Sequence, residues 1–214
     1  MSKIPTSSDL VYATVKELIL SAELPGGELI SEGDIATRVG TSRTPVREAF
    51  LRLEAEGWMK LYPKRGALIV PIADGEAEHI VAARLLVETG SLCAFRSDTG
   101  RREAAAAEMR ASVNRQRDLA ASAGSAAFTE EDADFHSVVV RYGANPLLAA
   151  FYVGLRDRQR RMAACSVGRD PMQIDRIIAD HAQLASFVEH GNVEEFDTLL
   201  RSHMREVHHL TARR

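Results

Sequence analysis

The sequence predicts a mainly α-helical protein, with a head of three helices and a β-hairpin followed by an all-α antiparallel helical bundle. Aromatic residues are only 6% of the 214 residues and alanine is abundant, which favours packed helices over an extensive sheet. Apolar residues recur at helical spacing through most of the chain. Only two neighbouring stretches, 58–62 and 67–72, have the length and composition of strands.

The composition limits how the protein can work. Hydrophobic residues make up 45% of the chain, enough for a core, and a formal net charge of −3 excludes a global basic field. Any binding of nucleic acid therefore requires a local basic patch. We find no signal-peptide pattern and no apolar stretch of membrane-spanning length, which predicts a cytoplasmic protein with no membrane association. Cys93 and Cys165 are expected to be buried, reduced thiols.

The head is predicted to contain three short helices and one hairpin. Its predicted elements are helices at 9–22, 31–40 and 42–56 and strands at 58–62 and 67–72. Asp9, Ser31 and Ser42 stand where helix N-caps are expected, because their side chains can accept from the free amides of a first turn. Gly40 and Gly57 end the second and third helices.

The tail is predicted to be helical throughout. From Asp74 onward we find no convincing strand, and each break between helices contains a glycine or a proline. The predicted tail helices are 74–97, 100–122, 127–143, 146–167, 171–190 and 192–212. The alanine-rich stretch 103–127 carries charges that fit a solvated helix better than a linker. The chain is therefore expected to form two domains, 1–73 and 74–214.

The segment TSRTPVREAF opens the third helix of the head with many hydrogen-bond donors. Apolar residues at spacings of three and four define its buried face: Val46, Ala49, Phe50 and Leu53. The donors gather on the outward side of its N-terminal end: Ser42, Arg43, Thr44 and Arg47. Arginines, hydroxyls and a helix N-terminus suit phosphates and guanine edges in a DNA major groove.

The hairpin adds a basic tip with Lys64, Arg65 and Gly66. Glycine at this position would allow the backbone to approach a DNA minor groove closely. Two short helices that carry a donor-rich third helix, followed by a basic hairpin, have the order of a winged helix-turn-helix.

A purely structural interpretation remains open for Arg43 and Arg47, which could pair with Glu48 or Glu54 on a solvated face. Residues 1–73 contain nine Lys or Arg and nine Asp or Glu, so the head has no net charge. Six of the nine bases lie between positions 43 and 65, so the basic patch is local. A single head should bind DNA weakly, whereas a homodimer would present two heads to a palindromic operator.

Four tail residues have the side chains and spacing of a metal site. Asp132 and His136 are four apart in EEDADFHSVVV, so they point the same way on a helix, and His181 and His203 lie in two later helices. One carboxylate and three imidazoles suit a divalent transition metal such as Zn²⁺ or Ni²⁺. Spacing alone also allows ordinary buried histidines. Asp134 is an alternative acidic partner, although it faces away from His136.

Residues 25–70, PGGELISEGDIATRVGTSRTPVREAFLRLEAEGWMKLYPKRGALIV, resemble the winged helix-turn-helix of GntR-type bacterial transcription regulators. The resemblance is most specific in SRTPVREA and in the RG of the hairpin. It implies that the outward donors of the third helix read the operator and that Arg65 and Gly66 make the wing contact. Gly33 is a departure, because the fatty-acid-responsive branch has a DNA-contacting arginine there. This chain is expected to lack that contact.

Four tail segments resemble the FCD effector domain of the same family: RLLVETGSLCA (84–94), DADFHSVVVRYGANP (132–146), DHAQLASFVEHGNVEEF (180–196) and SHMREV (202–207). Metal-binding members use an Asp-x3-His pair and two further histidines. These map onto Asp132, His136, His181 and His203. Six tail helices suggest the shorter, VanR-like branch.

The resemblance also suggests two effector-binding residues, each with a simpler alternative. Arg84 would lie at the effector cavity and clamp a carboxylate, but it could also form an ordinary ion pair with Glu88, four residues on. Asn145 would lie near the metal pocket, and it also stands before Pro146, where it would cap the next helix.

These observations predict a cytoplasmic, homodimeric transcription regulator, most simply a repressor. Its head would bind a palindromic operator, and its tail would bind a divalent metal and a small carboxylate effector. An alternative is a metal-dependent hydrolase that uses the aspartate and three histidines, although the sequence contains no HExxH, GxSxG or P-loop motif. A third possibility is a vestigial metal site in a tail that only dimerises.

Overall fold

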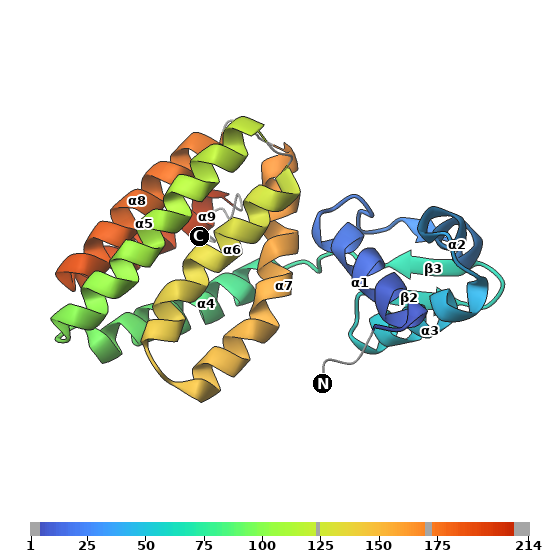
Figure 1. Ribbon diagram of the computed structural model, residues 1–214, viewed down its shortest axis with the longest axis horizontal. Helices are drawn as coiled ribbons and strands as arrows, with labels where there is room; N and C mark the ends of the chain where they lie inside the picture. The colour runs from blue at the N-terminus through green and yellow to red at the C-terminus, as the bar shows by residue number, and fades with distance from the viewer. Residues whose placement is uncertain (1–4, 123–124, 170–172, 208–214) are drawn as a thin grey trace. The chain divides into compact units, whose positions relative to one another are not determined.

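The protein consists of two compact units, Met1–Ile72 and Ala73–Arg214. The computed structural model describes residues 5–122, 125–169 and 173–207. Helices dominate both units, and the strands among these residues belong to the first unit, which confirms the predicted fold class (Figure 1). The division falls one residue before the boundary expected from the sequence.

The first unit contains three helices and a small sheet. Its elements are α1 (Ser7–Leu20), β1 (Leu29–Ile30), α2 (Glu32–Val39), α3 (Arg43–Ala55), β2 (Met59–Tyr62) and β3 (Gly66–Ile69). Apolar side chains from the three helices and the strands form one core, in which Val15, Phe50 and Leu53 are fully buried. This core fixes α3 with its polar N-terminal residues outside.

The sheet has the strand order β1-β3-β2, and both pairs are antiparallel. Met59 pairs with Ile69, and Tyr62 pairs with Gly66 beside the hairpin tip. The sequence did not predict β1, in which Leu29 pairs with Leu68. Two residues are too few to show the alternation that marks a strand.

Two of the three predicted cap positions are correct, and one of those two caps lacks the expected side-chain bond. Thr6, not Asp9, caps α1: the Thr6 hydroxyl accepts from the Asp9 amide at 3.1 Å, and the Asp9 carboxylate accepts from the Thr6 amide at 3.0 Å. Ser31 caps α2 as expected. Ser42 stands at the cap position of α3, but its side chain makes no capping bond. The third helical residue there is Pro45, which has no N–H to donate.

The second unit contains the predicted helices in its described part. They are α4 (Glu76–Phe95), α5 (Thr99–Ser122), α6 (Ser125–Tyr142), α7 (Pro146–Arg169), α8 (Gln173–His190) and α9 (Val193–Val207). Residues 171, 172 and 208–212, which the sequence also assigned to helices, lie outside the described residues.

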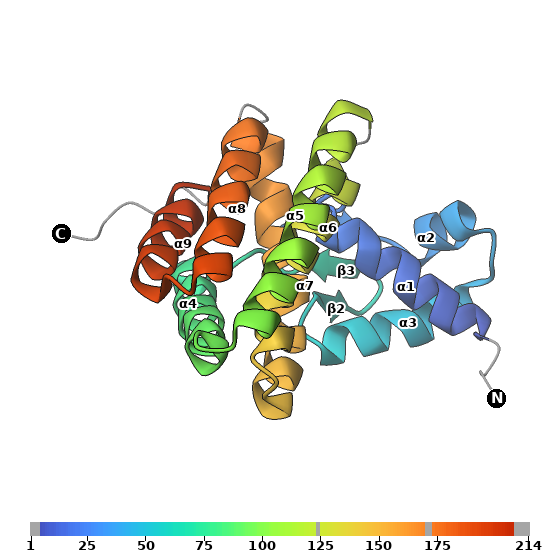
Figure 2. The same ribbon diagram turned by 60° about the vertical axis from the view of Figure 1, so that its left-hand side comes forward.

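Five of these helices form a closed ring. α5 packs against α6 and α8, α4 packs against α6 and α9, and α8 contacts α9. Figures 1 and 2 both show α5 running between α8 and α6. α7 packs against α4 and α6. Side chains that point into the ring can therefore meet although their helices are far apart in sequence.

α5 is not simply a solvated helix, as its alanines and charges suggested. It has a buried stripe that includes Met109 and Val113 and also two polar residues, Ser112 and Gln116. Cys93 is exposed and Cys165 is partly exposed, so the expectation of two buried thiols was wrong. Among the described residues, no helix is long and apolar enough to span a membrane.

Candidate DNA-binding surface and metal centre

The exposed side of α3 carries the donors that the sequence singled out. Val46, Ala49, Phe50 and Leu53 are 0% exposed, so they hold the helix on the core. The four predicted contact residues at its N-terminal end are exposed: Ser42, Arg43, Thr44 and Arg47. Because Ser42 makes no capping bond, its hydroxyl remains available to a phosphate.

The structure brings the two predicted groups of the head to one hollow. This hollow has a volume of about 650 Å³ and lies between the start of α2, the face of α3 and the hairpin. Its lining includes the two arginines of α3 and the hairpin tip: Arg43, Arg47, Lys64, Arg65 and Gly66. The sequence placed these residues on separate elements, and the fold collects them on one surface.

The cations around this hollow differ from the other cations of the unit. Arg38 pairs with Glu23 at 2.8 Å, and Arg52 pairs with Asp9 at 2.7 Å. Within the described part of the chain, the cationic side chains that line the hollow form no ion pair or hydrogen bond: Arg43, Arg47, Lys64 and Arg65. The pairing of these arginines with glutamates of α3, which the sequence left open, is not observed.

Two glycines shape the same surface. A Cβ on Gly66 would lie 2.2 Å from the Ile30 carbonyl oxygen, and its φ is +106°. Glycine is therefore required by the packing of β3 on the chain's own β1, a reason that the sequence did not reveal. A Cβ on Gly33 would lie 3.3 Å from Nη2 of Arg43. The absence of a side chain at position 33 leaves space that the Arg43 guanidinium occupies.

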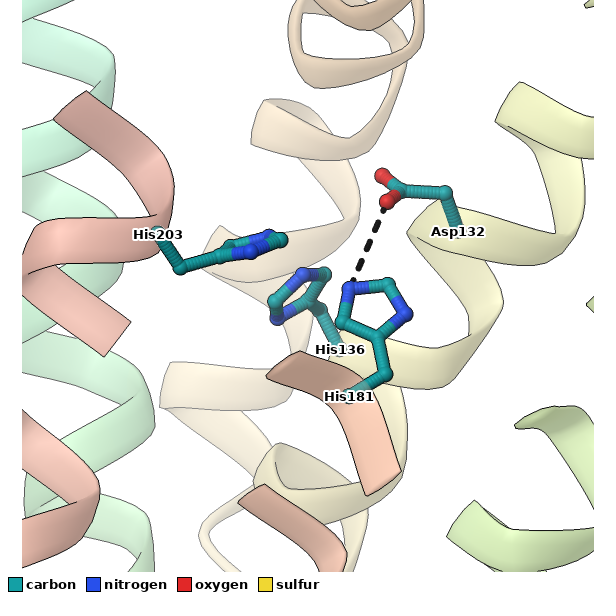
Figure 3. A group of neighbouring side chains, drawn as sticks. All are labelled: Asp132, His136, His181 and His203. Carbon is teal, nitrogen blue, oxygen red and sulfur yellow. Dashed lines mark ion pairs between the residues drawn. The ribbon is translucent and has the colours of Figure 1, made fainter. Parts of the chain in front are cut away.

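The second unit brings the four predicted metal ligands together. Asp132 and His136 come from α6, His181 from α8 and His203 from α9, and all four are buried. One ligand atom from each lies within 4.8 Å of the others. Figure 3 shows the three imidazoles and the carboxylate converging from three helices. The alternative acidic residue, Asp134, pairs instead with Arg156 at 2.6 Å.

Each imidazole is oriented through its Nδ1 atom. His136 Nδ1 lies 2.9 Å from a Glu88 oxygen, His203 Nδ1 lies 3.0 Å from an Asp180 oxygen, and His181 Nδ1 lies 2.7 Å from Oε1 of Gln116. Metal-binding histidines in proteins are typically held in this way, with one ring nitrogen on a partner and the other on the metal. The Nε2 atoms are thus the ones available to a shared ligand.

These residues fit a divalent transition metal. Nε2 of His181 is buried without a hydrogen-bond partner among the described residues and lies 3.6 Å from the Asp132 carboxylate. Burial, with smaller contributions from the neighbouring histidines and Arg84, holds the pKa of His181 well below its ordinary value, so the ring is neutral and can donate a lone pair. Ligands about 2.1 Å from one ion lie at most about 4.2 Å apart, which the cluster reaches with a small contraction.

A buried polar network joins this cluster to Arg84. The ion pair with Glu88 is present at 2.9 Å, but both side chains are buried, unlike an ordinary surface pair. The Tyr152 hydroxyl donates to the same Glu88 oxygen at 2.6 Å. Nη2 of Arg84 and Oε1 of Gln159 have no hydrogen-bond partner within the described residues. Buried polar atoms of this kind need a partner, so these two could each hydrogen-bond to a polar ligand.

Asn145 acts as a helix cap. Its side-chain oxygen accepts from the amides of Leu147 at 3.0 Å and Leu148 at 3.2 Å, at the start of α7. Its side chain is exposed, whereas the four metal-site residues are buried. The effector-binding role suggested for it stays a prediction.

Several residues of this centre escaped the sequence analysis. They are the partners of the ligands and of Arg84: Gln116, Tyr152, Gln159 and Asp180. A signal existed for Gln116, because Ser112 and Gln116 are polar residues at positions that continue the apolar stripe of α5. No comparable signal marks the other three, whose contacts come from different helices.

The fold is that of a winged helix-turn-helix unit joined to an all-helical unit. Residues 7–69 match the "Bacterial regulatory proteins, gntR family" model, and residues 79–206, more than half of the chain, match the FCD domain. The chain therefore belongs to the GntR family of transcription regulators and carries an FCD domain.

Individual relatives agree with this assignment. The chain is 29% identical to an HTH-type transcriptional regulator of Streptomyces ambofaciens, over 92% of this chain and 81% of that protein. It is 22% identical to the HTH-type transcriptional repressor RspR of Escherichia coli, over 92% and 85%. The solved structure of E. coli McbR/YncC has the same fold, with a TM-score of 0.74 and 16% identity over 95% of each chain. The protein is a regulator and not an enzyme, and the hydrolase alternative gains no support.

Proposed function

We propose that this regulator binds operator DNA with residues 1–73 and that residues 74–214 hold a divalent transition metal and a small carboxylate effector. The observation that carries this proposal is the convergence of Asp132 and three imidazoles on one buried point, with every imidazole oriented through Nδ1. Such an arrangement is costly to build for structural reasons alone, since buried polar groups need partners.

The DNA contacts are assigned to the cations that have no partner in the head. Arg43 and Arg47 would enter the major groove with the hydroxyls of Ser42 and Thr44, and the hairpin tip would follow the adjacent backbone or minor groove. The support for this assignment is that other cations of the unit, Arg38 among them, are already ion-paired.

The metal would be held by Asp132 Oδ1 and the Nε2 atoms of His136, His181 and His203. When bound, Zn²⁺ or Ni²⁺ would supply a positive charge and a coordination position for an effector oxygen. The chain's own contribution to the effector is Arg84, whose buried Nη2 could donate a charge-assisted hydrogen bond to a carboxylate.

The protein is proposed to act as a homodimer through the exposed faces of α4 and α7, which pack together. Uncharged exposed residues lie along these faces, with the charged Glu78 and Arg158 at their ends: Ala82, Leu86, Gly90 and Cys93 on α4, and Leu147, Ala150, Phe151 and Gly154 on α7. Leu86 and Leu147 are 78% and 80% exposed. A Cβ on Gly90 or Gly154 would meet nothing within 4 Å, so the large side chains of a second copy would find space there.

Regulation would follow from thermodynamic linkage between effector binding and DNA binding in the dimer. An effector that binds more tightly to one arrangement of the two heads shifts the population toward that arrangement, and DNA affinity changes by the same factor. The sign is proposed to be repression that the effector relieves. The support for repression is that the E. coli relative is named a transcriptional repressor.

The test combines metal analysis with operator binding. Elemental analysis of the purified protein should find about one transition-metal ion per chain. Fluorescence anisotropy with DNA from the region upstream of its own gene should then show release of DNA by one member of a panel of small carboxylic acids, and chelation should abolish that release. Metal-free protein that nevertheless releases DNA with the same acid would contradict the metal-dependent effector site.

A further inference from the structure

The three metal-site histidines are oriented by different kinds of partner. Glu88 and Asp180 hold His136 and His203 directly. An ionised carboxylate can only accept a hydrogen bond, so it keeps the proton on Nδ1 and leaves Nε2 bare for a metal. His181 is held by the amide of Gln116, which could equally present its oxygen or its nitrogen.

The orientation of that amide follows from a chain of hydrogen bonds. Oγ of Ser112 donates to Oε1 of Glu131 at 2.6 Å, so the oxygen of Ser112 is left to accept. It accepts from Nε2 of Gln116 at 3.4 Å. Gln116 must then turn its Oε1 to His181, which lies at 2.7 Å. His181 can satisfy this oxygen only with a proton on Nδ1.

This series of hydrogen bonds ends near the surface at the Glu131 carboxylate, which accepts from Ser112. Arg115 donates to both oxygens of Glu131, at 2.8 and 2.9 Å, which holds the carboxylate in place beside Ser112. Ser112, Gln116 and His181 are at most 1% exposed. A reversed amide would place the Gln116 oxygen against a Ser112 oxygen whose proton is already used. The reversed orientation is therefore disfavoured, because a buried acceptor without a partner loses its hydrogen bond to water with no replacement.

We propose that Glu131, Ser112 and Gln116 form a relay of positioning residues that fixes the tautomer of His181 for metal binding. This inference rests on the metal site proposed above. On this proposal α5 supplies no metal ligand, but its side chains fix the tautomer of His181, the ligand from α8. The relay also explains why two polar side chains interrupt the buried stripe of α5.

Two variants break the relay without touching a ligand. Ser112→Ala removes the link to Gln116, and Glu131→Ala frees the Ser112 proton so that the amide can turn over. For each, zinc affinity measured by competition with a chromophoric chelator should fall about tenfold, the lower end of the range for partners of metal ligands. Glu108→Ala is the matched control, since Glu108 pairs with Arg141 between the same two helices but has no link to a ligand. Its zinc affinity should equal that of the wild type.

A rescue variant separates the direction of the hydrogen bond from general packing. In Ser112→Ala/Gln116→Glu, a carboxylate again faces His181 and can only accept. Zinc affinity should therefore return to within about threefold of the wild type. Long-range ¹⁵N–¹H NMR of the metal-free protein gives an independent reading: His181 should carry its proton on Nδ1 in the wild type and in Glu108→Ala. It should populate both tautomers in Ser112→Ala.

The results distinguish the relay from the metal site itself. Wild-type zinc binding with unchanged affinity and tautomer in Ser112→Ala and Glu131→Ala would overturn the relay and leave the metal site standing. If the double variant binds zinc no better than Ser112→Ala, the acceptor argument is wrong. A wild-type protein that binds no zinc or nickel would refute the metal assignment and the role of the relay with it.

Discussion

The side chains of Arg43 and Arg47 have no partner in the described structure, although Glu48 and Glu54 lie on the same helix. Glu54, one candidate partner, instead accepts from the Leu61 amide at 2.7 Å and ties α3 to β2. Leaving two exposed guanidiniums unpaired costs the fold little stability, since a surface ion pair contributes only about 0–1 kcal/mol. It does keep both free for a polyanion.

Arg43→Ala and Arg47→Ala should each weaken operator binding about 5- to 150-fold, because each removes a contact worth about 1–3 kcal/mol. Arg38→Ala is the control, since this exposed arginine is already paired with Glu23. Fluorescence anisotropy at several salt concentrations measures the loss. An Arg38→Ala variant that loses as much affinity as Arg43→Ala would argue against the assignment of the surface.

Gly66 lies in the proposed DNA-binding surface, but it is the packing of the fold that requires glycine there. Gly66→Ala should lower the free energy of unfolding by about 2 kcal/mol or more, because the φ of +106° and the Ile30 carbonyl both oppose a Cβ. Gly27→Ala provides the comparison, since Gly27 has a φ of +89° but open space around it, and should cost only about 1 kcal/mol. Thermal unfolding without DNA measures both. Equal losses would mean that backbone conformation alone accounts for Gly66.

At the level of elements, the helices of both units could be predicted because each has a strong period and clear breaks. β1 could not, since its pairing with β3 is a long-range contact made by only two residues. The caps were less certain than the helices. Pro45 shows why: it removes one of the two amides from which an N-cap side chain can accept, and Ser42 makes no capping bond.

The α4 and α7 faces lead to an expectation about assembly. Leu86→Arg or Phe151→Arg should weaken the homodimer about 30-fold or more, because a buried apolar anchor would be replaced by a charge without a partner. Leu10→Arg, at a leucine of α1 that is 55% exposed, is the matched control and should leave assembly unchanged. Analytical ultracentrifugation measures the dissociation constant. Variants of α4 and α7 that remain as dimeric as the wild type would exclude this face.

For the molecule as a whole, the metal site joins elements that the chain order keeps apart. The ligands come from α6, α8 and α9, and their partners include Glu88 on α4 and Gln116 on α5. A bound ion would therefore cross-link much of the helical ring, whereas the first unit has its own separate core. Metal binding should therefore change the unfolding of the second unit and not that of the first.

Removal of metal should lower the unfolding temperature of the second unit and leave that of the first unchanged. Zinc at about 100 times its dissociation constant stabilises the folded state by about 2.7 kcal/mol, which corresponds to a shift of roughly 5–10 °C. His203→Ala should abolish the zinc-dependent shift, while His190→Ala, at an exposed histidine of α8, should retain it. Differential scanning calorimetry with and without chelator decides this. A zinc-dependent shift that survives in His203→Ala would place the metal elsewhere.

The sequence by itself determined the class of fold, the outward side of α3 and the identity of the four converging tail residues. The first two follow from local spacing, since residues three or four apart share a helix face. The four tail residues were identified through the resemblance to the FCD domain, because spacing relates only Asp132 to His136. Only the tertiary structure decided which acceptor holds each imidazole, that Glu88 links Arg84 to His136, and that Gly66 serves β1. Those contacts join residues up to 65 positions apart, and their donors and acceptors are fixed by packing between helices that no local pattern records.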